Sequence, residues 1–301
     1  MRTLLRWLAR IILVLIAVTA IFLGYVYWRS GATLAQRIVV NESALAVPAG
    51  TDAVARGERL ATTHGCTDCH DQDLGGRTVL DQAPVGRLAA PNLTRGKGGV
   101  GARLDAAAIE HAVRHGIGTD GRILLFMPSF DYAILADADV ADIIAYVQAR
   151  PGVDREMPAS AYGPVLRSLW VLGQVPSPDA LRIDQHARHA ATIEAAPTAE
   201  YGAYVSRSCT GCHGENFSGG PIPGLPPSFP PAQNITPDTA TGIGKWSKAD
   251  FYAAMREGRR PDGTAINPFM PWQAFARMSD TELDALWAFL QTKPARPAGG
   301  R

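Results

Sequence analysis

The fold of this chain is decided by two stretches of sequence, Cys66-Thr67-Asp68-Cys69-His70 and Cys209-Thr210-Gly211-Cys212-His213. Both stretches read Cys-x-x-Cys-His, and the second begins 143 residues after the first. Together they contain all four cysteines of the 301-residue chain. Residues at positions i, i+3 and i+4 share one face of a helix, so two thiols and one imidazole would face the same flat group.

This spacing is that of a c-type haem attachment motif. Cys66, Cys69, Cys209 and Cys212 are therefore expected to attach two haems covalently. Three other chemistries also use paired cysteines. A disulfide within each pair is open to an exported protein, zinc would need further Cys or His ligands at comparable spacing, and a thioredoxin-like pair would need a strand and helix context that is absent. The histidine after each pair favours haem, with His70 and His213 as the proximal iron ligands.

The motifs are part of a longer internal repeat. Its other matched segments are Asn92-Leu93-Thr94 with Asn234-Ile235-Thr236, Asp120-Gly121 with Asp262-Gly263, and Phe126-Met127-Pro128 with Phe269-Met270-Pro271. Each copy closes with an apolar pattern of helical period, over Val140–Val147 and Leu283–Leu290. Two copies of one domain are the simplest interpretation.

Several helix boundaries follow from local signals. Ser279-Asp280-Thr281-Glu282 is a capping box, and Pro151 and Pro294 end the two closing helices. A middle helix is expected over residues 106–115, with Gly116 as its stop. Its counterpart is expected over residues 248–257, with Ser247 as N-cap and Gly258 as stop.

The sixth position of each iron has a matched candidate. Met127 follows His70 by 57 residues and Met270 follows His213 by 57, and each methionine precedes a proline. They are therefore the expected axial ligands, which would fill both axial positions and favour electron transfer. Three other methionines are expected to fill the hydrophobic core: Met157, Met255 and Met278. Five other histidines are expected to be solvated: His64, His111, His115, His186 and His189.

The N-terminus predicts a membrane anchor. Ile11–Val26 is uncharged and mostly apolar, and with its apolar flanks it approaches the roughly 20 residues that span a bilayer. Arg2, Arg6 and Arg10 precede it, which indicates a cytoplasmic N-terminus. A cleaved signal peptide is the alternative, but the bulky Tyr-Val-Tyr-Trp-Arg that ends the run is a poor cleavage site.

The expected domain organisation follows from these features. It comprises a transmembrane signal anchor (1–29), a juxtamembrane segment (30–49), a first domain (50–151), a linker (152–198), a second domain (199–294) and a flexible tail (295–301). The linker holds one apolar patch around Leu166–Leu172, which is expected to pack on one or both domains, with a membrane-surface contact as the alternative. The net charge of +1 does not indicate a nucleic-acid-binding protein, which would need clustered Lys and Arg residues.

At these residues the sequence resembles the class I cytochrome c family in its bacterial multihaem form. The strongest segments are Asn234–Asp238, Thr241–Ser247 and Phe269–Trp272, which are similar to the cytochrome c subunits of membrane-bound alcohol, aldehyde and gluconate dehydrogenases. The resemblance implies an all-α fold of short helices around each haem, with the first and last helices crossing. Tyr146 and Phe289 are the expected aromatics at the crossings. Those subunits usually carry three haems, whereas this chain has motifs for two.

The function expected is one-electron transfer by a dihaem cytochrome c that is not itself an enzyme. The donor would be periplasmic or membrane-bound, such as a dehydrogenase, and the acceptor a respiratory cytochrome or terminal oxidase. The location would be a bacterial inner membrane, crossed once, with the haem domains in the periplasm. The alternative is a dihaem peroxidase-like oxidoreductase with one displaceable axial ligand.

Overall fold

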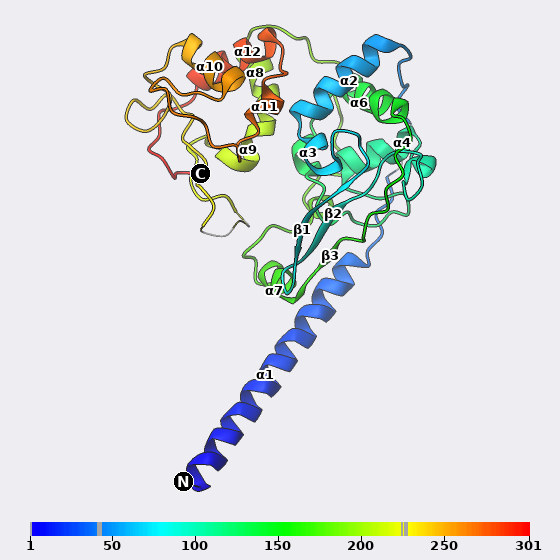
Figure 1. The fold of residues 1–301 in the computed structure, drawn as a ribbon, viewed down its shortest axis with the longest axis vertical. Helices are drawn as coiled ribbons and strands as arrows, with labels where there is room; N and C mark the ends of the chain where they lie inside the picture. Colours follow the sequence, from blue (N-terminus) through cyan, green and yellow to red (C-terminus); the bar gives the residue numbers. More distant parts are fainter. Residues whose placement is uncertain (1, 41–43, 224, 226–227) are drawn as a thin grey trace.

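A single long helix carries a head of two similar helical units (Figure 1). The computed structural model describes residues 2–40, 44–223, 225 and 228–301. Helix α1, Arg2–Leu34, is the one helix in the described part of the chain that is long and apolar enough to cross a membrane, a test that a signal sequence also passes. It continues beyond residue 29, the predicted end of the anchor. Nearly all of its side chains are exposed apart from Val26 and Ser30, which are covered by the head.

The two units repeat the same order of helices. The first contains α2 (Thr51–Thr63), α3 (Cys66–His70), η1 (Gly101–Arg103), α4 (Ala106–Glu110), η2 (His111–His115), α5 (Ser129–Tyr132) and α6 (Asp137–Ala149). The second contains α8 (Ala199–Val205), α9 (Arg207–His213), α10 (Lys248–Glu257), α11 (Trp272–Phe275) and α12 (Asp280–Gln291). The predicted all-α class with two tandem domains is confirmed for the helices, and a small sheet is added to it.

The first and last helices of each unit cross at a glycine. A Cβ atom on Gly57 of α2 would lie 1.9 Å from the Asp142 carbonyl oxygen and 2.8 Å from the Tyr146 Cβ atom of α6. A Cβ atom on Gly202 of α8 would lie 2.6 Å from the Phe289 Cβ atom of α12. Tyr146 and Phe289 therefore lie at the crossings, as expected, and the backbones approach so closely that only glycine fits.

Local signals predicted the helix ends well in the second unit. Helix α10 runs from Lys248 to Glu257, and Ser247 and Asp250 form a capping box before it. Gly258 ends the helix with φ at 65°, a left-handed conformation that favours glycine. In the first unit the expected helix over 106–115 divides into α4 and a π-helical turn, η2, before Gly116.

The first unit and the linker together contain a small sheet that the sequence did not predict. Strands β1 (Arg77–Gln82) and β2 (Gly86–Ala90) form an antiparallel hairpin, and β3 (Ala161–Tyr162) pairs with β2 through Gly86 and Tyr162. Helix α7 (Pro164–Val171) and the short η3 (Asp179–Leu181) follow. The linker thus packs on the first unit, because its backbone completes the sheet there.

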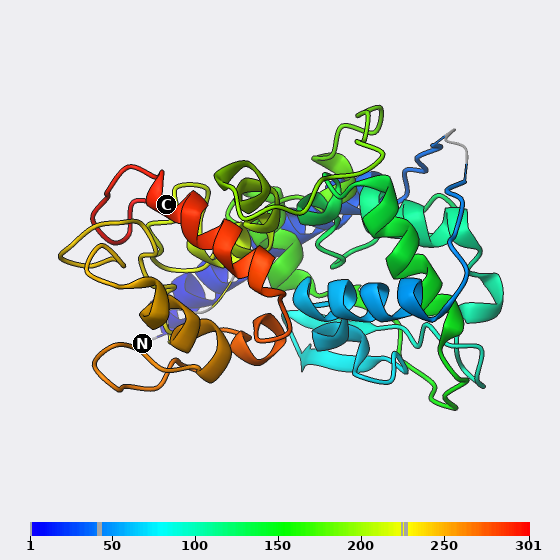
Figure 2. The same ribbon diagram turned by 90° about the horizontal axis from the view of Figure 1, so that it is seen from above.

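The two units are in direct contact (Figure 2). The Tyr204 hydroxyl of α8 accepts a hydrogen bond from the Ala136 amide and donates one to Asp139 at the start of α6. Arg59 of α2 forms an ion pair of 2.5 Å with the buried Glu282 of α12. These polar contacts fix the position of one unit against the other.

The C-terminal segment 295–301, for which the sequence predicted a flexible tail, folds back on the second unit. The Arg301 guanidinium donates to the carbonyl oxygens of Gly211 and Cys212, at 3.0 and 2.5 Å. The Gly299 amide donates to the Ser218 carbonyl oxygen. The difference arises because the last carbonyls of a helix lack partners within the helix, and a cation satisfies them.

Candidate haem-binding sites

Both Cys-x-x-Cys-His motifs form a short helix, α3 and α9, so their three functional side chains lie on neighbouring positions of one face. None of the four cysteines forms a disulfide. Burial raises the pKa of Cys66 and of Cys209 to about 12, because a thiolate would lose its hydration there. The thiols are therefore kept neutral and close to the apolar core of each unit.

The histidine of each motif is oriented by a backbone carbonyl. His70 Nδ1 lies 2.9 Å from the Pro91 carbonyl oxygen, and His213 Nδ1 lies 2.7 Å from that of Gln233. A carbonyl only accepts, so Nδ1 carries the proton and Nε2 keeps its lone pair. Burial also lowers the pKa of both histidines. Each imidazole is thus held neutral and oriented as a metal ligand requires.

The repeated Asn-x-Thr segment holds the loop that supplies this carbonyl. Asn92 Oδ1 accepts hydrogen bonds from the amide and the hydroxyl of Thr94, at 2.9 and 2.7 Å, and its Nδ2 donates to the Val153 carbonyl oxygen. The orienting residues Pro91 and Gln233 lie immediately before these asparagines, so the signal that could have identified them is the repeat itself.

Asn234 plays the same part in the second copy. Its Oδ1 accepts from the amide and the hydroxyl of Thr236, at 3.0 and 2.8 Å, and its Nδ2 donates to the Arg296 carbonyl oxygen and the Thr241 hydroxyl. The side chains of Asn234 and Thr236 are both buried. The loop is therefore tied to the chain that follows the last helix.

We expect Asn234→Ala to lower the free energy of unfolding by about 3 kcal/mol, because the buried partners of the amide lose their hydrogen bonds. Thermal unfolding followed by circular dichroism measures this. Asn216→Ala is the control, since its side chain donates to Gly300 in the C-terminal segment, and we expect a change below about 1 kcal/mol. Equal effects of the two substitutions would contradict the role of Asn234.

The predicted sixth ligands pack on the same cores as the predicted attachment residues. Met127 and Cys66 both pack against the core of the first unit, and Met270 packs against the core that contains Cys209. The prolines that follow have nearly the same backbone conformation, with φ and ψ of −79° and 54° at Pro128 and −78° and 55° at Pro271. Both copies therefore present the methionine from an equivalent turn.

Comparison with known families agrees with this geometry. The family model described as cytochrome c matches residues 199–293, and the one described as cytochrome c oxidase, cbb3-type, subunit III matches residues 52–147. The chain contains two cytochrome c domains. Domains of this kind bind haem c, and two domains are consistent with two haems. The donor set of two thiols, one oriented imidazole and one thioether in each domain fits such a group.

Three relatives illustrate the similarity. The cytochrome c subunit of the quinone alcohol dehydrogenase of Gluconobacter oxydans is 40% identical over 94 residues, which are 29% of this chain and 20% of that protein. The gluconate 2-dehydrogenase cytochrome c subunit of Pantoea cypripedii is 38% identical over 29% of this chain and 21% of its own length. A dihaem c-type cytochrome of Cereibacter sphaeroides is 38% identical over 20% of this chain and 21% of its own length. The chain thus matches about a fifth of the length of these relatives.

The methionine loops of the two cytochrome c domains differ in what covers them. In the first domain, Tyr162 of β3 donates a hydrogen bond of 2.6 Å to the Leu125 carbonyl oxygen and packs edge-on against Phe126 at 4.8 Å. In the second domain the equivalent Phe269 is 42% exposed and packs edge-on against Phe229. The linker therefore supports only the first of the two loops.

Not every histidine is solvated. His115 is 1% exposed, its Nδ1 is bonded to Gln185 Oε1 at 2.8 Å, and its ring packs edge-on against those of His111 and His189. The expectation of a solvated side chain was wrong for His115, because the linker folds over η2. Burial also lowers the pKa of His64. Met255 and Met278 are buried in the core, as expected.

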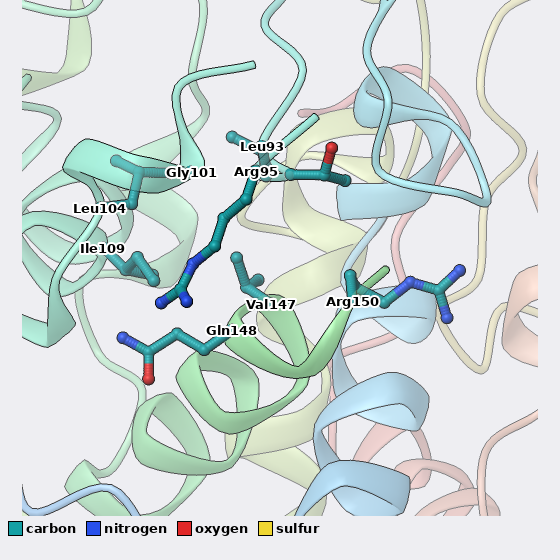
Figure 3. Close-up of a pocket in the computed structure, with 9 residues that line it drawn as sticks. Leu93, Arg95, Gly101, Leu104, Ile109, Val147, Gln148 and Arg150 are labelled. Atoms are coloured by element: carbon teal, nitrogen blue, oxygen red, sulfur yellow. The ribbon is translucent and has the colours of Figure 1, made fainter. Parts of the chain in front are cut away.

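A small cavity lies beside the first haem-binding loop (Figure 3). It is lined by residues of the segment that follows Asn92 and of α6, and the Arg95 side chain reaches across it toward Gln148. Its volume of about 10 Å³ is room for one water. The cavity is therefore too small for anything larger than a water molecule.

Proposed function

We propose that this protein is a dihaem cytochrome c that transfers single electrons and has no catalytic site of its own. One haem would be held by Cys66, Cys69, His70 and Met127. The other would be held by Cys209, Cys212, His213 and Met270. The observation that carries the proposal is that both domains orient the motif histidine by the same kind of backbone bond, and that both carry the methionine in an equivalent turn against the same core.

Haem c would supply a one-electron iron couple, whose potential the protein tunes through axial ligands, burial and hydrogen bonds. Burial lowers the pKa of the two histidines and so favours the neutral imidazoles, and the carbonyl bonds to Nδ1 leave Nε2 unprotonated. Thioether ligation favours the reduced state. With a histidine and a methionine both holding the iron, no position on it would be left for a substrate, which favours electron transfer over catalysis.

The contact between the domains supports their action as one unit. Helix α5, which follows the Met127 loop, packs on the motif helix α9 of the second domain. The polar contacts of Tyr204 and of Arg59 described above hold this junction. A fixed distance between two redox sites is what intramolecular electron transfer requires.

The proposed donor is a dehydrogenase, and the proposed acceptor is a cytochrome or a terminal oxidase. The first part is supported by relatives that are named as cytochrome subunits of alcohol, gluconate and fructose dehydrogenases. We also propose that α1 is a retained single-pass anchor in a bacterial inner membrane, with the haem domains in the periplasm. Arg2, Arg6 and Arg10 at its N-terminal end support this orientation.

The test of the proposal is replacement of each axial methionine. In Met270→Leu, the intensity of the Met-to-ferric-iron charge-transfer band should fall to roughly half. The reduction potential of one haem should fall by tenths of a volt, since the choice of axial ligands spans roughly 0.8 V. Met127→Leu should do the same at the other haem. Absorbance spectroscopy and redox titration of the full-length protein measure both effects.

Met255→Leu is the matched control, because Met255 is a buried core residue of the second domain and the substitution conserves volume. It should leave the band and both potentials unchanged. An unchanged band in both axial variants would overturn the assignment of these ligands.

A further inference from the structure

One face of α7 is apolar and partly exposed to solvent. Val165, Leu169 and Leu172 follow the spacing i, i+4, i+7 along the helix and its C-cap, and they are 39%, 37% and 57% exposed. This spacing puts the three side chains on one stripe of the helix. The sequence Pro164–Val171 contains no acidic residue. The stripe therefore carries no charge that would oppose an apolar or anionic surface.

The opposite face of α7 packs on the end of α1. The Arg167 guanidinium donates a hydrogen bond of 2.7 Å to the Ser30 hydroxyl and lies 4.9 Å from the centre of the Tyr27 ring. Ser30 is fully buried by this contact. Figure 1 shows α7 beside the upper end of the long helix, at the base of the head. The stripe is thus held close to the point where α1 leaves the head.

The level of this contact along α1 is that of a membrane interface. If the span begins after Arg10, then about 20 residues at about 1.5 Å each cross the roughly 30 Å of hydrocarbon and end near Ser30. Tyr25 and Trp28 lie at this end and are 51% and 69% exposed, as aromatic residues of an interfacial belt would be. Between α1 and α7 a cavity of about 330 Å³ opens, with Arg29, Thr33 and Trp170 in its wall, beside this interface.

We propose that the Val165–Leu169–Leu172 stripe of α7 lies in the outer surface of the phospholipid bilayer and sets the orientation of the head. The proposal rests on the proposed anchor, since only a retained α1 brings α7 to the lipid. A short amphipathic helix beside a transmembrane helix buries its apolar face at the boundary between headgroups and acyl chains. The observation that selects lipid as the occupant is continuity with the aromatic end of α1.

The contact would reach the first haem site through the linker. Tyr162, two residues before α7, bonds to the Leu125 carbonyl oxygen and packs on Phe126, next to Met127. The ring of Trp170 of α7 lies 6.1 Å from that of Tyr162. The first cytochrome c domain is therefore the one whose methionine loop is fixed relative to the membrane.

The test uses full-length haem-loaded protein in liposomes of phosphatidylethanolamine and phosphatidylglycerol. Leu169→Cys is labelled with an environment-sensitive fluorophore, and its emission is compared with and without lipids that carry a nitroxide near the headgroup end of the acyl chain. Ile16→Cys in the middle of α1 reports the span. Asp52→Cys, an exposed position at the start of α2, is the control for a label in water.

We expect the nitroxide lipids to reduce the emission at position 169 at least about twofold and to leave position 52 nearly unchanged, as for an interfacial helix. Quenching at position 16 without quenching at position 169 would overturn the inference and leave the anchor intact. Absence of quenching at both positions would overturn the anchor as well.

Discussion

Replacing Cys209 and Cys212 together with alanine is expected to lower the haem content from two to one per chain and to unfold the second cytochrome c domain. Cys209 is part of the buried core of that domain, with Phe217, Leu283 and Leu286 among its members. The proposed haem would be covalently held there, and its apolar surface would be part of the core. Without it, the short helices of a domain of this size have too little apolar burial to stay folded.

The measurement has two parts. Haem content per chain comes from the absorbance of the denatured protein, and the helix content from circular dichroism. The converse double variant, Cys66→Ala with Cys69→Ala, should leave the other haem. A control at Ser208→Ala changes a hydroxyl beside the motif and should keep both haems. Two haems in either double variant would disprove covalent attachment at these cysteines.

The second large effect is expected at the helix crossing of the second domain. A Cβ atom on Gly202 would lie 2.0 Å from the Ala285 carbonyl oxygen, far inside van der Waals contact. Gly202→Ala should therefore force α8 and α12 apart and cost about 3 kcal/mol, at the upper end of overpacking effects. For a domain of about 100 residues this corresponds to a fall in melting temperature of roughly 10 to 20 °C.

Gly211→Ala is the matched control. Gly211 lies in helix α9 of the same domain, and an added Cβ atom there would lie 3.5 Å from Asp131 Oδ2, which is ordinary contact. Its melting temperature should stay the same or rise, because alanine has the higher helix propensity. Scanning calorimetry measures the melting temperatures of the Gly202→Ala and Gly211→Ala variants. Equal values for the two variants would show that the helix crossing tolerates a side chain. Gly57→Ala should act similarly on α2 and α6 of the first domain.

The two crossing glycines depend on tertiary contacts that no local sequence pattern reveals. The crossing of the first and last helices was expected from the resemblance, and so were Tyr146 and Phe289. The repeat does not mark the partner glycines as a matched pair, because Gly57 and Gly202 lie 145 residues apart, whereas the motifs are offset by 143. Their role depends on contacts with α6 and α12, some 80 residues further along the chain, and no local pattern reports such a contact.

The sequence by itself predicted the chemistry of the sites and determined most of the helix boundaries. A spacing of i, i+3 and i+4, a capping box before α12 and a glycine after α10 act within one or two helical turns, so they can be read without knowing the fold. The fold alone decided which carbonyls orient His70 and His213, that the linker completes a sheet over the Met127 loop, and that α7 lies at the end of α1. Each of these depends on groups brought together from distant parts of the chain, and their burial and hydrogen bonds exist only once the chain is packed.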